Sequence, residues 1–159
     1  MRISIMKKLI LASAIMLAMT ACETSTSSNS SSGGKGAVVD YGFSCKVTRT
    51  DNSVNVYETL MGMVYDETST VKLGDDGYYY TEIVTKESYP TAYAADDACE
   101  DWREEASHWH DGSHRVVCEG KTVTVYDYSD DADLEEIEDD YNGICEVARR
   151  AVESGEFED

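Results

Sequence analysis

Three histidines near the middle of the chain have side chains that could bind a transition metal. His108, His110 and His114, with Asp111 between them, form the pattern H-x-H-D-G-x-H. Imidazole and carboxylate groups are ligands of zinc and copper, so one hypothesis for this segment is a metal site. The spacing differs from the H-x-H-x-D-H motif of metallo-β-lactamase-like hydrolases. The alternative interpretation, which we favour, is an exposed loop between a helix and a strand.

Carboxylates are the commonest reactive groups, since the chain has 32 aspartates and glutamates. The acidic run from Asp127 to Asp140 could attract calcium, but it lacks the D-x-[DN]-x-[DN]-G loop that places oxygens around the ion. A pair of carboxylates could hydrolyse glycosides, yet the sequence singles out no pair among so many. The G-x-S-x-G, H-E-x-x-H and glycine-rich phosphate motifs do not occur. We therefore expect a non-catalytic binding or structural module without a cofactor. The alternatives are a small hydrolase, a metal-binding protein or an inhibitor of secreted hydrolases.

Tyrosines are candidates for contact with a partner. The chain has 11 tyrosines and 2 tryptophans, and Tyr78, Tyr79 and Tyr80 are consecutive. Successive side chains of a strand point to opposite faces, so Tyr79 should point away from its two neighbours. We expect Tyr79 to be exposed and to contact a protein or stack on a glycan.

The first 22 residues carry a targeting signal. In the segment MKKLILASAIMLAMTAC, two lysines precede an apolar stretch from Leu9 to Met19, which is typical of a secretory signal. This stretch is roughly half of the 20 or so residues that a membrane-spanning helix needs. Its end, Met19-Thr20-Ala21-Cys22, resembles the lipobox of bacterial lipoproteins.

The resemblance implies that residues 1–21 are a signal peptide and that lipid on Cys22 anchors the chain to a bilayer. Glu23 stands where an aspartate favours inner-membrane retention of lipoproteins, so the expected location is the cell envelope, at the outer membrane. Translation could start at Met1 or at Met6, and the sequence does not distinguish them. The domain could face the periplasm or the cell surface. The alternative is an ordinary secretory peptide, which would leave Cys22 as a free thiol.

Lipidation of Cys22 leaves four cysteines, and an even number favours two disulfides in an exported protein. These are Cys45, Cys99, Cys118 and Cys145, and they include no C-x-x-C pair of the kind that binds zinc or carries redox chemistry. We favour sequential pairing, Cys45 with Cys99 and Cys118 with Cys145, which would staple a helix to the sheet in each half. Pairing of Cys45 with Cys118 and of Cys99 with Cys145 is the alternative.

Composition divides the rest of the chain into a tether and a domain. Residues 22–36 start with the lipidated cysteine and continue without any aliphatic or aromatic residue, so we expect a flexible tether with a span of roughly 20 Å. Residues 37–159 suffice for a single domain. Cleavage would leave 10 basic residues against 32 acidic ones, a formal net charge of −22. Such a surface repels phosphate, which makes nucleic acid an unsuitable partner.

The spacing of apolar residues predicts the elements that position these groups. Alternation predicts four strands between residues 43 and 86, with a bulge at Gly62 and a turn at 74–77. Pro90 then precedes a helix, and two short strands follow at 114–118 and 121–128.

A last helix is predicted from Leu134 to Val152, where apolar residues recur every three or four positions. Gly143 costs about 1 kcal/mol inside a helix, so a break near Asn142 is an alternative. The expected fold class is α+β, in the order ββββαββα, with two disulfides and both helices on one face of a mainly antiparallel sheet.

Overall fold

The computed structural model describes residues 41–109 and 114–154. Cys22, the predicted tether and His110 lie outside these ranges. The described elements are β1 (Ser44–Arg49), β2 (Ser53–Leu60), β3 (Met63–Leu73), β4 (Tyr79–Ser88), α2 (Ala92–Ala106), β5 (Arg115–Glu119), β6 (Thr122–Ser129) and α3 (Leu134–Ser154). The predicted α+β class and the order ββββαββα are therefore confirmed.

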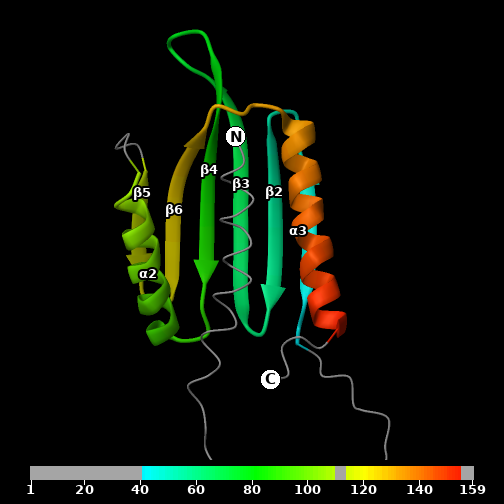
Figure 1. Ribbon diagram of the computed structural model, residues 1–159, viewed down its shortest axis with the longest axis vertical. Helices are drawn as coiled ribbons and strands as arrows, with labels where there is room; N and C mark the ends of the chain where they lie inside the picture. The colour runs from blue at the N-terminus through cyan, green and yellow to red at the C-terminus, as the bar shows by residue number, and fades with distance from the viewer. Residues whose placement is uncertain (1–40, 110–113, 155–159) are drawn as a thin grey trace, which may run out of the picture.

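The six strands form one sheet in the order β1-β2-β3-β4-β6-β5 (Figure 1). All five neighbouring pairs are antiparallel. After β4 the chain passes through α2 to the edge strand β5 and returns through β6, which pairs with β4. The two outer strands of the sheet are thus β1 at one edge and β5 at the other.

The second and third strands are separated by a tight turn, so the prediction of a bulge at Gly62 is wrong. Met61 and Gly62 both have positive φ, 52° and 81°. Two central residues of positive φ are the hallmark of the two-residue turn whose twist matches that of a β-hairpin. The turn joins Leu60 to Met63, which are paired residues of β2 and β3.

Each helix is preceded by a residue whose side-chain oxygen accepts a hydrogen bond from a backbone N–H of the first turn. Thr91 precedes α2, and its hydroxyl accepts a hydrogen bond from the Ala94 N–H at 3.1 Å. Before α3, the Asp133 carboxylate accepts a hydrogen bond from the Glu135 N–H at 2.9 Å. α3 runs without interruption through Gly143, so the alternative of a break there is wrong. The apolar face of α3, packed on the sheet around Gly143, offsets the cost of this glycine.

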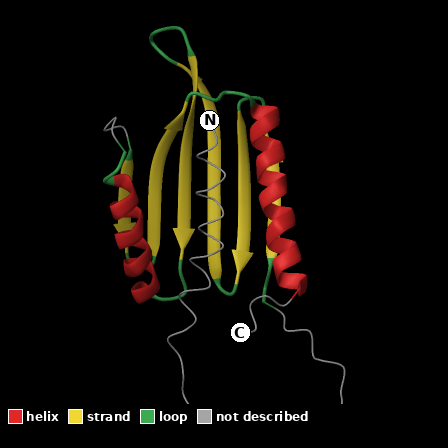
Figure 2. Ribbon diagram, viewed as in Figure 1, coloured by secondary structure: helices red, strands yellow, loops and turns green. Residues whose placement is uncertain are grey.

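Two small apolar cores lie under the helices, on the same face of the sheet (Figure 2). Under α3, Val54 and Val56 of β2 pack with Tyr141 and Cys145. Under α2, Cys99 packs with two valines of β6. Figure 2 shows the helices toward opposite sides of the sheet, with β3 and β4 between them.

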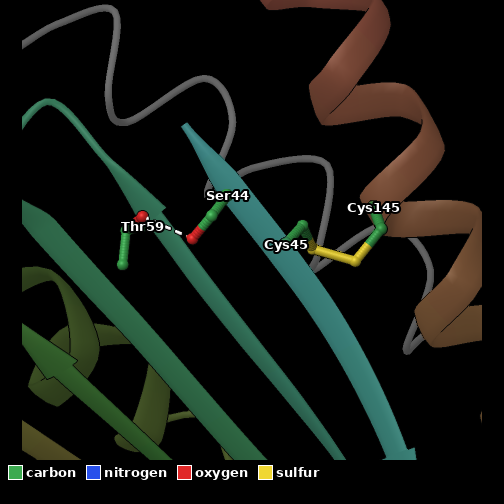
Figure 3. The surroundings of a disulfide bond; sticks show 4 residues. All are labelled: Ser44, Cys45, Thr59 and Cys145. Atoms are coloured by element: carbon green, nitrogen blue, oxygen red, sulfur yellow. Dashed lines mark hydrogen bonds between the residues drawn. A yellow bond between two sulfur atoms is a disulfide. The ribbon is translucent and has the colours of Figure 1, made fainter. Parts of the chain in front are cut away.

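Each helix is joined to an edge strand by a disulfide. Cys145 of α3 bonds to Cys45 of β1 (Figure 3). Cys99 of α2 bonds to Cys118 of β5. The prediction that each disulfide would join a helix to the sheet is confirmed, but the favoured partners are wrong, as is the alternative pairing. The reason is topological: α2 lies over β5 and β6, the strands that follow it, whereas α3 lies over β1 and β2.

Candidate functional site

Buried polar side chains gather on the two central strands. Directly paired residues of an antiparallel sheet share a face, and alternate residues of each strand return to it. We call the helix-side surface of β3 and β4 the central strip. It carries every side chain that is polar or charged and buried in the part of the chain that the structure describes. These are Glu67, Ser69, Thr81, Thr85 and Glu87.

Two buried carboxylates are diagonal neighbours on this strip. Glu67 of β3 pairs with Thr85 of β4, and Tyr65 pairs with Glu87. Such diagonal positions lie roughly 7–8 Å apart. Glu58 of β2 pairs with Tyr65 on the other side, so a third carboxylate continues the same row. Burial of charge is costly, which makes three neighbouring carboxyl groups an unusual feature on the helix side of a sheet.

Glu67 is held by three hydroxyl groups. Its Oε2 accepts hydrogen bonds from Tyr65 and from Thr85, the latter at 2.8 Å, and its Oε1 accepts one from Tyr141 at 2.7 Å. Burial and the charge of Glu67 both raise the pKa of Tyr65 and Tyr141, so these hydroxyls stay protonated. Glu67 therefore joins β3, β4 and α3 through charge-assisted hydrogen bonds.

Glu87 is held on one oxygen only. Its Oε2 accepts hydrogen bonds from the Tyr89 hydroxyl at 2.6 Å and from the Trp102 indole N–H at 3.0 Å. Its Oε1 is enclosed and has no hydrogen-bond partner. Burial raises the pKa of Glu87, the two hydrogen bonds oppose this rise, and the charge of Glu67 adds to it.

Glu58 makes the stability of the fold depend on pH. Burial raises its pKa from 4.5 to about 7. In the range from pH 4.5 to 7 the folded protein therefore binds more protons than the unfolded chain, and stability falls as pH rises through this range. We expect Glu58→Gln to be more stable than the wild type at pH 8, by about 2 kcal/mol after allowance for solvent screening. Urea denaturation at pH values from 4.5 to 8 measures this difference.

The matched control for Glu58 is Glu100→Gln. Glu100 is exposed on α2, so its replacement removes one charge without changing a buried carboxyl. We expect the control to keep the fall in stability between pH 4.5 and 7. If the two variants showed the same pH profile, the assignment of this fall to Glu58 would be wrong.

The chemistry open to the strip is narrower than its carboxylates suggest. No group of three His, Cys, Asp or Glu side chains is placed to hold a metal ion within residues 41–109 and 114–154. A glycosidase-type pair needs a second carboxylate free to act as base or nucleophile. Glu67 instead accepts three hydroxyl hydrogen bonds. Oε1 of Glu87 has no hydrogen-bond partner, and it suits a hydrogen-bond donor, most of all a cationic one.

The predicted histidine site is only partly described. His108 lies exposed after α2, with Nδ1 2.9 Å from the Glu104 carbonyl oxygen. Nδ1 of His114 lies 2.6 Å from Oδ1 of Asp127, and the His114 ring lies 4.5 Å from that of Trp109. These contacts give His114 a structural role. Because His110 is not described, metal binding stays a prediction.

The β3–β4 hairpin ends in an exposed apolar tip, which projects past the rest of the sheet in Figure 1. Leu73, Tyr78 and Tyr79 are 61%, 76% and 63% exposed. The turn between them is closed by a hydrogen bond from the Gly74 N–H to the Tyr78 carbonyl oxygen at 2.8 Å. Tyr79 is exposed as predicted, and its binding role stays a prediction. We define Leu73, Tyr78 and Tyr79 as the hairpin tip.

Sequence reasoning missed the carboxyl groups of Glu58, Glu67 and Glu87 on the helix side of the sheet, and the exposure of Tyr78. Glu58 had a usable signal, because it interrupts the inward-facing series Val54, Val56 and Leu60. Glu67 and Glu87 had a weaker one, since polar residues surround them on both faces of their strands.

Comparisons with protein-family models, with curated proteins and with solved structures find no match to this chain. Among the described helices, none combines the length and apolar character needed to cross a membrane. The central strip and the hairpin tip are therefore the surfaces from which a function can be inferred.

Proposed function

We propose that this protein is a lipoprotein of the cell envelope, anchored through lipid on Cys22, that acts as a non-catalytic binding module. The hairpin tip is the observation that carries this proposal. Three neighbouring large apolar side chains, each more than half exposed, stand at the end of a projecting hairpin. Solvent-exposed aromatic residues of this kind are typical anchors of protein interfaces.

The proposed anchor and tether suit such a module. Residues 23–36 are polar and small, and their typical span of roughly 20 Å would hold the domain off the membrane surface. The lipobox resemblance and Glu23 support an outer-membrane location. The expected partner is an envelope protein or a glycan, reached by the tip of a domain that the tether allows to reorient.

The sheet face opposite the helices is a second surface that could contact a partner bound at the hairpin tip. By strand alternation it carries Lys46, Lys72, Lys86 and Arg115 together with only three acidic residues, Asp66, Glu82 and Glu119. It is therefore close to neutral in a strongly acidic protein. Tyr80 and Tyr128 pack together on this face at a ring distance of 6.0 Å, next to the hairpin tip. A partner on the tip could extend over this face without strong repulsion.

Photo-cross-linking in native cells tests the proposal. A photoreactive phenylalanine derivative replaces Tyr79 in one variant and Tyr93 in another. Tyr93 is a matched control because it is 75% exposed and lies at the start of α2, at the opposite end of β4 from the tip. We expect a discrete adduct from position 79 that position 93 does not give.

Intact mass supplies the second readout of this experiment. We expect lipid mass on the wild type and none on Cys22→Ser, with the tip adduct lost or reduced when the anchor is removed. A protein without lipid, or equal adducts from both tyrosine positions, would count against the proposed function.

A further inference from the structure

One carboxylate oxygen of Glu87 is buried without a hydrogen-bond partner. Its side chain is 1% exposed, and Oε1 has no hydrogen-bond partner while Oε2 accepts two hydrogen bonds. Protonation does not remove this deficit: a proton on Oε1 would be a buried donor, and a proton on Oε2 would leave Oε1 a buried acceptor. Buried polar atoms in native proteins nearly always have a hydrogen-bond partner, ordered water included, so Oε1 keeps an acceptor site that the residues around Glu87 do not fill.

The negative charge of the carboxylates around Glu87 favours a cation as the donor to Oε1. Glu67 lies on the central strip with Glu87. Glu58 lies in the same cross-strand row as Glu87, since both are paired with Tyr65. Tyr89 and Trp102 both contact the Glu87 carboxylate. Both of these donors bind Oε2, which leaves Oε1 open, and a carboxylate forms its strongest hydrogen bonds with charged donors.

We propose that the central strip binds an alkylammonium group, with Oε1 of Glu87 accepting a hydrogen bond from its N–H. The group could be a free amine or the end of a lysine side chain. A metal ion fits less well, because hard cations need several converging oxygens and the oxygens of Glu67 already accept hydroxyl hydrogen bonds. Glu87 lies at the opposite end of β4 from the hairpin tip, so this site is separate from binding through the tip.

The indole of Trp102 provides a reporter for this binding. It shares the Glu87 carboxylate with the ligand, so its N–H resonance should shift when an ammonium group reaches Oε1. The chain has only two tryptophans, and Trp109→Phe identifies the Trp102 signal. The probe is n-butylammonium, added to the purified full chain, and neutral 1-butanol is its matched control.

We expect a saturable shift with butylammonium and none with butanol. Glu87→Gln keeps an acceptor for Tyr89 and Trp102 but removes the charge, and should weaken binding at least 10-fold. Glu100→Gln, which removes an exposed charge from α2, should change binding less than 2-fold. The wild-type comparison of the two probes decides the case even if Glu87→Gln fails to fold.

A third probe, N-acetyl-lysine methylamide, distinguishes the sources. Tighter binding of this probe than of butylammonium supports a lysine of a protein partner, and the reverse supports a free amine. No saturable shift with either probe, an equal shift with butanol, or equal weakening in the two glutamine variants would overturn the proposal.

Discussion

Replacement of Cys45 and Cys145 by alanine should lower the free energy of unfolding by about 4–5 kcal/mol. This disulfide joins residues that are 100 positions apart. In the chain-entropy model, a cross-link that closes a loop of this length restricts the unfolded chain strongly and stabilises the folded state by about 4.7 kcal/mol. Such a loss is close to the whole stability of many small domains, which is about 5–15 kcal/mol.

The second disulfide is the matched control for the first. Cys99 and Cys118 are 19 positions apart, and the same model gives about 3 kcal/mol for this bond. Urea denaturation of the two double-alanine variants should therefore show a difference of about 1–2 kcal/mol, with the Cys45/Cys145 variant the less stable. An equal or larger loss from the Cys99/Cys118 variant would mean that local packing around α2, not loop length, dominates.

The helices and strands could be predicted from sequence because, along most of the chain, the spacing of apolar residues and the positions of glycine, proline and turn residues indicate the same boundaries. The clearest case is α3, where the predicted helix from Leu134 to Val152 matches the observed Leu134–Ser154. The exception was the Met61-Gly62 turn. Methionine at positive φ is rare, so only the glycine gave a signal, and a lone glycine in a strand pattern equally suggests a bulge.

Disulfide partners could not be predicted because they depend on where each helix crosses the sheet. Four cysteines on two strands and two helices allow three pairings, and sequence distance favoured Cys45 with Cys99. The observed pairing follows from tertiary placement: the last helix returns across the first two strands of the sheet, which brings Cys145 to Cys45.

The buried carboxyl groups of the central strip could not be predicted from the sequence because acidic residues are so common in this chain. In a chain with 32 acidic residues, a glutamate on a strand is expected to face solvent, and only the neighbouring strands reveal that Glu67 and Glu87 face inward. The hairpin tip was easier to find, since a run of three tyrosines next to a turn must expose at least one ring. Polar residues therefore need the sheet register before their role can be inferred.

Glu67→Ala is expected to cost about 3–5 kcal/mol of stability at neutral pH. The change leaves the hydroxyls of Tyr65, Thr85 and Tyr141 without their acceptor, and a buried donor that loses its partner costs about 1–3 kcal/mol. Ser69 compensates in part, because its hydroxyl lies 2.6 Å from that of Tyr141. Urea denaturation measures the loss, and Glu67→Gln, which keeps a carbonyl acceptor, is the control with the smaller expected effect.

A second effect of Glu67→Ala acts in the opposite direction and would raise the stability of the variant. Removal of the Glu67 charge relieves the desolvation of a buried carboxylate and its repulsion of Glu87, whose pKa should fall toward its usual value. If this relief dominated, Glu67→Ala would be as stable as the wild type. We expect the loss to dominate because the three hydroxyls already offset much of the desolvation cost, and alanine also leaves a cavity between the strands and α3. Tyr141→Phe separates the two terms: it removes one donor and leaves the charge, so combined with Glu67→Ala it should cost less than the sum of the single losses.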